Sequence, residues 1–419
     1  MFSEFELIRY AMGCRKGVFF IDCFFLCSLV LLFVLQTPGT LIFATLLCIF
    51  YALLRHKSVI FQFHKSKVVF FISLFLVINH FLGGAQGVTS IFYLFSTIAC
   101  FYAAVGFGSS SLRHVGGCLF FVYWIYVFFV ISGFLSNCDD VEPLGAVIPG
   151  ASTNGLPSYL IVLQIALSLL VLLDKFVLPV ISATVTFFIA ILGFGRGSVI
   201  VSFSVLVFSI FFNLMIVQSK NGYRQVYLLV FFSGFVFLAV IGYVFAVGWN
   251  QASLLFPGSG VARWICNSVW FPLIASGDAV NDVAGTKWIW GIADPARARM
   301  LYDYIGKLDF SGIWFGVNYE GTSIVSDFKG NPHNSYIRLH SHYGLPGLFL
   351  VFYSILLLII SNKDSYFKFA TFFLVFFVLL RAVTEPIIFP TVLDFFYFLY
   401  FVVYFNYAAI GREWRTHAK

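Results

Sequence analysis

Side chains that can move protons or bind anions are concentrated between residues 333 and 342. The group comprises His333, Asn334, Arg338, His340 and His342, and hydrophobic sequence resumes at Gly344. An imidazole, with an ordinary pKa of about 6.5, can accept a proton near neutral pH, and a guanidinium offers planar donors that suit a phosphate. Such groups at the edge of a polar segment predict an active site at a water–lipid boundary.

Each of these residues also has a simpler interpretation. His333 would act as a base, or would only hydrogen-bond a loop carbonyl. Asn334 would orient the imidazole or cap the helix that follows. Arg338 would contact an anionic substrate or serve as an ordinary interfacial cation, and His340 and His342 are expected to be side chains at the level of the lipid headgroups.

Arg196 is a second candidate, because it lies between two apolar runs and has a glycine on each side. With no side chain on Gly195 or Gly197, a phosphate could approach both the guanidinium and bare backbone N–H groups. The alternative is an arginine that only anchors a helix end at headgroup depth.

A third candidate site lies at the start of residues 295–308, which are predicted to form a short amphipathic helix. Its apolar face carries Met300, Leu301, Tyr304, Ile305 and Leu308. Arg297 and Arg299 lie in its first turn. They would bind substrate, or would be surface arginines paired with Asp294 or Asp303.

The composition excludes a soluble globule. Of the 419 residues, 61% are hydrophobic and 10% are charged, whereas soluble domains are about 25% charged. Apolar runs of about 18 or more residues recur, each long enough to cross a bilayer as a helix. The sequence therefore predicts an all-α polytopic membrane protein whose first apolar run is retained as a helix, with membrane lipids and no nucleic acid among its partners.

Twelve transmembrane helices are predicted, and basic residues orient them. The expected spans are 17–36, 40–54, 68–83, 89–107, 116–135, 157–173, 176–194, 198–216, 226–248, 344–361, 369–388 and 391–410. Most Lys and Arg between the spans fall on one side, which the positive-inside rule makes cytoplasmic together with both termini.

The predicted topology divides the chain into three parts. Residues 1–248 hold helices 1–9, residues 249–343 form one large extracytoplasmic cap that carries catalytic residues, and residues 344–419 hold helices 10–12 and a cytoplasmic tail. The cap is rich in tryptophan, which suits a folded domain lying on a membrane.

Some charged residues are predicted to lie inside the bundle. Arg381 and Glu385 are four residues apart near the outer end of the eleventh span, which is ion-pair spacing on one helix face. The pair would tether helices or flank a substrate groove. Asp22 and Asp394 are isolated, and we expect them to make polar contacts within the bundle.

Cysteine spacing predicts no zinc site. Cys138 and Cys266 fall in two polar loops that the topology puts on the same side, so a disulfide between them is open. Asp139, Asp140 and Glu142 would bind a divalent cation or be solvated.

Spacing around His333 resembles a family signature. His333-Asn334, followed after nine residues by Gly344-Leu345-Pro346-Gly347, is similar to the motif of the O-antigen ligase and polymerase family, membrane enzymes that join glycans carried on a polyprenyl pyrophosphate. Arg196 resembles the family's arginine at the membrane boundary. Arg297 or Arg299 resembles its second arginine, with Arg299 slightly favoured from the position of Tyr302.

The resemblance implies a glycosyltransferase of the bacterial cell inner membrane. Its donor would be an undecaprenyl-pyrophosphate-linked oligosaccharide, bound on the periplasmic side. His333, Arg196 and Arg299 would be catalytic, and the substrate-binding residues would be Arg297, Asn334, Arg338, Gly195 and Gly197. The resemblance implies no metal and no other cofactor, so the acidic loop at 139–142 is expected to be solvated.

Two enzymes of this family and one transporter class fit the sequence. A polymerase would use the next lipid-linked repeat unit as acceptor, and a ligase would use lipid A-core; either would work beside other polysaccharide-assembly proteins. The content of 56 phenylalanines and the divergent first half favour the polymerase. A flippase is less favoured, because transporters usually carry charges near the midplane of several helices, whereas polar chemistry here gathers at one membrane face.

Overall fold

The fold is known from a computed structural model that describes part of the chain. The described residues are 16–35, 38–55, 74, 77–78, 81, 88–137, 144, 147, 155–175, 177–192, 196–219, 295–319, 322–326, 331–361, 365–388, 391 and 393–404. All regular secondary structure in these residues is helical. The chain is therefore an all-helical protein over the part described, as the sequence predicts.

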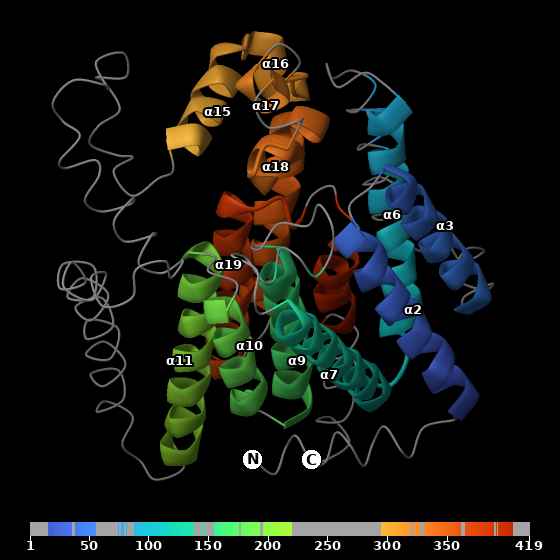
Figure 1. The fold of residues 1–419 in the computed structure, drawn as a ribbon, viewed down its shortest axis with the longest axis vertical. Helices are drawn as coiled ribbons and strands as arrows, with labels where there is room; N and C mark the ends of the chain where they lie inside the picture. Colours follow the sequence, from blue (N-terminus) through green and yellow to red (C-terminus); the bar gives the residue numbers. More distant parts are fainter. Residues whose placement is uncertain are drawn as a thin grey trace, which may run out of the picture.

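Twelve helices carry the labels of Figure 1. They are α2 (Lys16–Leu35), α3 (Pro38–Arg55), α6 (Val88–Gly108), α7 (Leu112–Ser136), α9 (Gly155–Lys175), α10 (Val180–Leu192), α11 (Arg196–Ser219), α15 (Pro295–Gly306), α16 (Phe310–Phe315), α17 (Ser323–Ser326), α18 (Ser335–Ser361) and α19 (Ser365–Thr384). A last helix covers Asp394–Tyr404.

Five of the described helices are long and apolar enough to cross a membrane. These stretches are Gly17–Leu35, Ile91–Gly108, Leu112–Ser136, Gly155–Leu173 and Gly197–Ile216. Large apolar side chains such as Phe24 and Phe128 face outward from these helices, where lipid rather than water would cover them. The chain is accordingly a helical membrane protein. The count of twelve spans remains a prediction, because five described helices qualify, and the predicted span 226–248 and most of 68–83 lie outside the described residues.

Helix α9 lies at the centre of the bundle. Its 19-residue apolar stretch is buried throughout, as expected for a helix that is hydrophobic on all sides. It packs against α7, α10, α11 and α19. The position of α9 matters for function, because residues near its first turn meet the candidate site.

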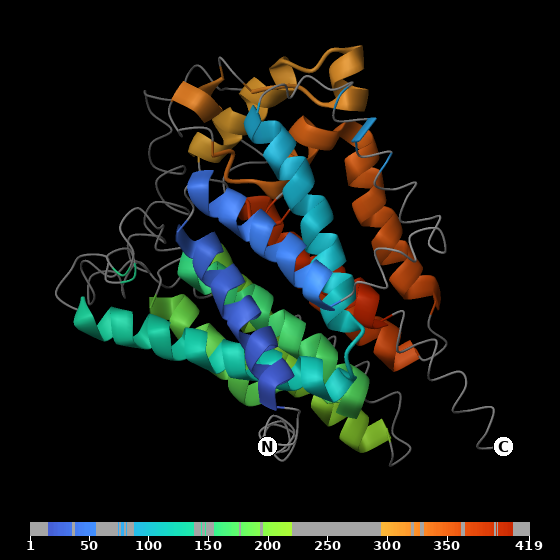
Figure 2. The same cartoon turned by 90° about the vertical axis from the view of Figure 1, so that its right-hand side faces the viewer.

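The described part of the predicted cap gathers at one end of the bundle. Figures 1 and 2 both show α15, α16 and α17 over the beginning of α18. These helices enclose a small hydrophobic cluster of their own, made by Met300, Tyr304, Ile324 and Ile337. Helix α18 continues from the cap into the predicted tenth span, so its start lies well before the predicted boundary at 344.

Two glycines let the cap touch α18 backbone to backbone. Gly316, with φ 86°, follows α16, and Gly344, with φ 62°, breaks the helical geometry of α18. A side chain on Gly316 would overlap the carbonyl oxygen of His340, and one on Gly344 would overlap the carbonyl oxygen of Trp314. Gly344, the first glycine of the His333 motif, therefore has a structural role: it allows the backbone of α16 to pack directly on α18.

We expect Gly344→Ala to weaken the docking of the cap. Both the positive φ and the overlap with Trp314 oppose a side chain here, at a cost of about 1–3 kcal/mol for the backbone strain alone. Thermal unfolding of the purified protein measures the loss. Gly306→Ala is the matched control, because a Cβ at Gly306 has nothing within 4 Å; equal stability of the two variants would contradict this explanation.

Candidate functional site

His333 is held in an unusual backbone conformation just before α18. Its φ is 43°, and among the described residues it is the only non-glycine residue with a positive φ. Its backbone N–H donates to Oδ1 of Asn331 at 3.0 Å, and its side chain is 29% exposed. A non-glycine residue in this region costs about 1–3 kcal/mol, and such residues cluster at active sites and ligand-binding sites.

Asn334 caps α18. Its Oδ1 accepts hydrogen bonds from the backbone N–H groups of Tyr336 at 2.8 Å and Ile337 at 3.2 Å. This is the usual bonding of an N-cap, which satisfies amides that have no partner within the helix. Of the two roles predicted for Asn334, the structure shows capping.

Ser335, two residues after His333, hydrogen-bonds to the chain at the end of α19. Its buried hydroxyl donates to the carbonyl oxygen of Glu385 at 2.8 Å and accepts from the backbone N–H of Ile388 at 3.2 Å. The chain after α19 is therefore fixed against the start of α18. The sequence gives no signal for this link, because a lone serine has many roles.

The predicted ion pair of Arg381 and Glu385 is confirmed. Nη2 of Arg381 lies 3.6 Å from Oε1 of Glu385, and the two residues are only 2% and 7% exposed. The guanidinium also donates to Oγ of Ser158 on α9, from Nη2 at 2.6 Å and Nε at 3.1 Å. The other carboxylate oxygen of Glu385 lies 3.9 Å from Nδ1 of His333. The pair therefore joins α9, α19 and His333.

The start of α11 lies beside the same contacts. Oγ of Ser198 is 3.4 Å from Oγ of Ser158. Arg196 is the first residue of α11 and Gly197 the second, whereas the side chain of Arg196 and all of Gly195 lie outside the described residues. Ser198, two residues after Arg196, therefore contacts the serine that accepts hydrogen bonds from Arg381.

Arg299 lies in a pocket of the cap. The pocket holds about 580 Å³ and is lined by Arg299, Tyr302, Asp303, Gly306, Lys307, Thr322, Ser323, Val325 and Ser326. Asp303 shapes it by accepting a hydrogen bond from the backbone N–H of Ser323 at 3.2 Å. Two basic side chains and several hydroxyls suit an anionic or hydroxyl-rich ligand. His333 does not line this pocket, and the side chain of Arg297 lies outside the described residues.

His340 and His342, which the sequence predicts at the level of the lipid headgroups, are both buried against other parts of the protein. Nδ1 of His340 accepts from the Tyr304 hydroxyl at 2.7 Å, and its Nε2 donates to the carbonyl oxygen of Ile313 at 3.0 Å. Burial lowers the pKa of His340. This imidazole therefore pins α15 and the end of α16 to α18.

The ring of His342 lies 5.0 Å from that of Tyr93 on α6. The guanidinium carbon of Arg338 lies 5.7 Å from the same tyrosine ring, in range of a cation–π contact. Arg338 and His342 therefore join α18 to the start of α6, and the structure gives Arg338 a packing role beside its predicted contact with substrate.

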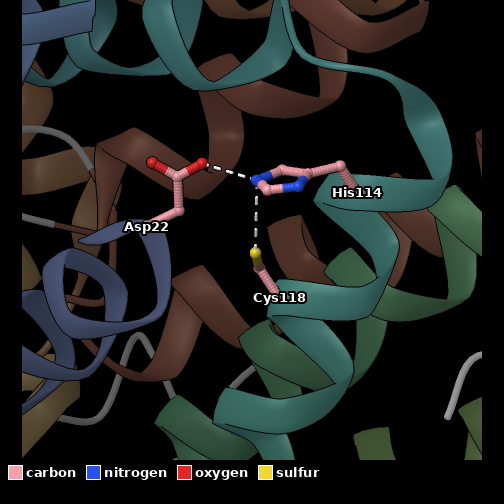
Figure 3. Close-up of side chains that lie close together, drawn as sticks. All are labelled: Asp22, His114 and Cys118. Carbon is pink, nitrogen blue, oxygen red and sulfur yellow. Dashed lines mark hydrogen bonds and ion pairs between the residues drawn. The ribbon is translucent and has the colours of Figure 1, made fainter. Parts of the chain in front are cut away.

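A second polar centre surrounds Asp22. It lies near the end of α6, away from Tyr93 at the start of that helix. The carboxylate accepts from the Tyr51 hydroxyl at 2.7 Å and from Arg55 at 2.8 Å. Its Oδ2 lies 2.6 Å from Nε2 of His114 (Figure 3). Asp22 makes the polar contacts within the bundle that the sequence predicts. The prediction that it is an isolated charge is wrong, because Arg55 faces it. Arg55 also donates to Ser110 beyond the end of α6 at 2.8 Å.

The Asp22 centre does not have the geometry of a catalytic triad. Cys118 Sγ lies 3.7 Å from Nε2 of His114, the same ring nitrogen that faces Asp22 (Figure 3). The imidazole therefore cannot pass a proton from thiol to carboxylate through its two nitrogens. The three donor groups are close enough to hold a metal ion, but Arg55 already balances the carboxylate. We interpret this centre as a contact that holds α2, α3 and α7 together.

Several predicted features fall outside the described residues. These are Cys138 and Cys266 with their open disulfide, the acidic residues 139–142, and Arg297 apart from its place in α15. Asp394 is described, and its Oδ2 accepts from the backbone N–H of Thr391 at 3.0 Å. Sequence reasoning missed Ser158, Ser335 and Lys307, because their roles depend on which helix ends meet.

Comparison of the chain with protein-family models, with curated proteins and with solved structures found no match in any of the three.

We predict that acid weakens the docking of the cap through His340. Because its pKa is lower in the docked cap than in an exposed histidine, the docked state binds fewer protons. The contribution of His340 to docking is complete above the ordinary histidine pKa. It is lost as the pH falls through the lowered pKa of His340, because a protonated Nδ1 cannot accept from Tyr304. Hydrogen exchange of residues 295–319, corrected for its intrinsic pH dependence, measures the effect.

Tyr304→Phe is the control for this acid effect. It removes the donor to Nδ1, so protection at neutral pH should fall and the further loss on acidification should shrink. Equal protection of the wild-type cap at pH 7.5 and pH 5 would contradict the assignment.

Proposed function

We propose that this protein is a glycan transferase of the bacterial inner membrane that uses an undecaprenyl-pyrophosphate-linked donor, with repeat-unit polymerisation as its reaction. The observation that carries the proposal is the strained backbone of His333, the residue that heads the family-like motif. Hydrogen bonds within residues 334–337, and from Ser335 to residues 385 and 388, fix the backbone that follows this histidine. Strained residues cluster at active sites, and this supports a role for His333 in the reaction.

Charge at the same end of the bundle supports an anionic substrate. The first turns of α9, α11 and α18 meet there, joined through Ser158, Ser198 and Ser335 with the end of α19. Helix N-termini carry partial positive charge and favour phosphate groups. In this proposal Arg196 adds a full positive charge at the start of α11.

The pocket of the cap supports a ligand that combines negative charge with hydroxyl groups. Arg299 and Lys307 supply cations, and Thr322, Ser323 and Ser326 supply hydroxyls. A lipid-linked glycan has both features. We assign this pocket to the donor or acceptor saccharide together with part of its diphosphate charge.

The proposed reaction balances without any further reactant. The acceptor hydroxyl gives its proton to the imidazole of His333 while its oxygen bonds to the anomeric carbon of the donor. The bond from that carbon to the diphosphate breaks, and undecaprenyl diphosphate leaves with the electron pair. In this proposal Arg196 stabilises the charge that develops on the leaving oxygen, and Arg299 binds the diphosphate from the pocket of the cap.

The proposed topology puts His333 in the periplasm and the Asp22 centre near the cytoplasm. Tyr93, close to the start of α6, contacts Arg338, whereas Arg55 bonds Ser110 just beyond the end of that helix. A helix of this length separates its ends by about 30 Å, which matches a hydrocarbon core. Arg55 then lies on the side that the positive-inside rule makes cytoplasmic.

We predict that a cysteine replacing Lys307 reacts with an impermeant maleimide in cells whose outer membrane alone has been opened. Lys307 is exposed in the cap. A cysteine replacing Ser109, exposed between α6 and α7, is the matched control and should react only after the inner membrane is opened. The reverse pattern would overturn the orientation.

Deletion of the gene should leave lipid A-core that carries a single repeat unit. His333→Ala should give the same gel profile at normal protein level, because loss of a positioned base lowers rates by about 10²–10⁴. His342→Ala, which changes a buried histidine of α18, should keep polymer whenever the protein is made. Bare core with accumulated lipid-linked polymer would assign the chain as a ligase, and wild-type polymer in His333→Ala would remove the histidine from the reaction.

A further inference from the structure

The pocket of the cap combines exposed apolar surface with an acceptor for hydroxyl groups. It lies where α15 and α17 pack against each other (Figure 1) and holds about 580 Å³, which is within the usual range for a small-molecule site. Tyr302 lines it from α15 and Val325 from α17, and these side chains are 71% and 42% exposed. We propose that the pocket is a saccharide subsite in which Tyr302 stacks on one face of a sugar ring and Asp303 accepts hydrogen bonds from the hydroxyls of that ring. The inference deepens the proposed function and rests on it for the glycan that the subsite receives.

Tyr302 has the properties of a platform for a sugar ring. Such a ring carries C–H groups on its faces and hydroxyls around its edge. The negative face of an aromatic ring attracts the C–H groups and removes them from water. A tyrosine that served only the packing of the cap would turn inward, as Tyr304 does at 3% exposure. Helix α15 therefore carries one tyrosine for its own core and another whose ring is open to a ligand.

Asp303, the next residue of α15, supplies the acceptor. Its Oδ2 accepts a hydrogen bond from the backbone N–H of Ser323 at 3.2 Å, which holds the carboxylate in place. Among the described residues, none donates a hydrogen bond to its Oδ1. A carboxylate has room for several donors and bonds them more strongly than a neutral oxygen does. Neighbouring hydroxyls of one sugar can therefore donate to Asp303 while the face of that sugar lies on Tyr302.

Ser323 gives an independent sign that the pocket takes a polar ligand. The residue is 4% exposed, and its hydroxyl has no hydrogen-bond partner in the part of the chain that the structure describes. An enclosed hydroxyl without a partner destabilises a protein. Ser323 lines the pocket, and a serine hydroxyl changes direction by rotation about one bond. A sugar hydroxyl can thus supply the missing partner.

Gly306 leaves room for the sugar ring. It also lines the pocket, and it lies four residues after Tyr302, one turn along the same face of α15. A Cβ at this position would have no atom within 4 Å. A large side chain at residue 306 would therefore fill the pocket without displacing its walls, which offers a way to close the subsite while its polar groups stay in place.

The test measures binding of a free oligosaccharide to the purified full-length protein. The probe is the repeat unit cleaved from the surface polysaccharide of the strain that makes the protein, followed by saturation-transfer NMR and calorimetry. We expect Tyr302→Ala to weaken binding about tenfold, because the ring face is lost, and Gly306→Trp to abolish it. Tyr302→Phe keeps the ring and should bind within about twofold of wild type. Absence of wild-type binding, equal loss in the two Tyr302 variants, or full binding by Gly306→Trp overturns the inference.

Two further variants keep the test decisive. Phe310→Ala alters another aromatic side chain of the cap, which is 80% exposed and does not line the pocket. It should bind as wild type, and a loss there would make the effect nonspecific and overturn the inference. Asp303→Asn keeps an acceptor for Ser323 but removes the charge, so binding should weaken about fivefold to tenfold; unchanged binding overturns the inference. If Gly306→Trp does not fold, the Tyr302 and Asp303 variants decide.

Glycan transfer separates this inference from the proposed function. If both are correct, Tyr302→Ala and Gly306→Trp raise the KM for the lipid-linked unit. Oligosaccharide binding that these variants lose, together with no transfer by the wild-type protein, refutes only the proposed reaction. Transfer by the wild-type protein that both variants leave unchanged refutes only the saccharide subsite.

Discussion

The guanidinium of Arg381 is the contact on which the candidate site depends. It is almost entirely buried, yet it reaches Ser158 near the start of the central helix α9 and Glu385 beyond the end of α19. Removing one partner of a buried ion pair typically costs about 3–5 kcal/mol, because the other charge is left uncompensated. At the end of the bundle that holds the candidate site, α9, α11, α18 and α19 are therefore held in one arrangement. This arrangement determines the position of His333.

A second constraint lies between the cap and the bundle. Gly316 and Gly344 permit contact between backbones that no side chain would allow, and His340 uses both ring nitrogens across the same interface. The cap is thus attached through α18, the helix whose first turn follows His333. Movement of the cap would therefore shift His333. Helix α18 is the element that connects the Arg299 pocket to the proposed base.

Local patterns predicted much of this organisation. Hydrophobic runs predicted an all-helical membrane protein, four-residue spacing predicted the Arg381 and Glu385 pair, and the apolar face of 295–308 predicted α15 with Met300 and Tyr304 inside. The sequence could not show that the pair faces His333, because that depends on which helix ends meet. The burial of His340 was missed for the same reason: its partners, Tyr304 and Ile313, come from two other helices. Asp22 was expected to be alone, since Arg55 and His114 lie far along the chain.

We propose that this chain transfers a glycan from a polyprenyl diphosphate with His333 as the base. The most direct measurement uses purified protein in liposomes with an undecaprenyl-diphosphate-linked repeat unit, alone or with lipid A-core, and follows glycan length and released undecaprenyl diphosphate. The account predicts a ladder of polymer from the lipid-linked unit alone, with one diphosphate carrier released per linkage, and none from His333→Ala. Absence of transfer by folded wild-type protein to either acceptor would contradict it.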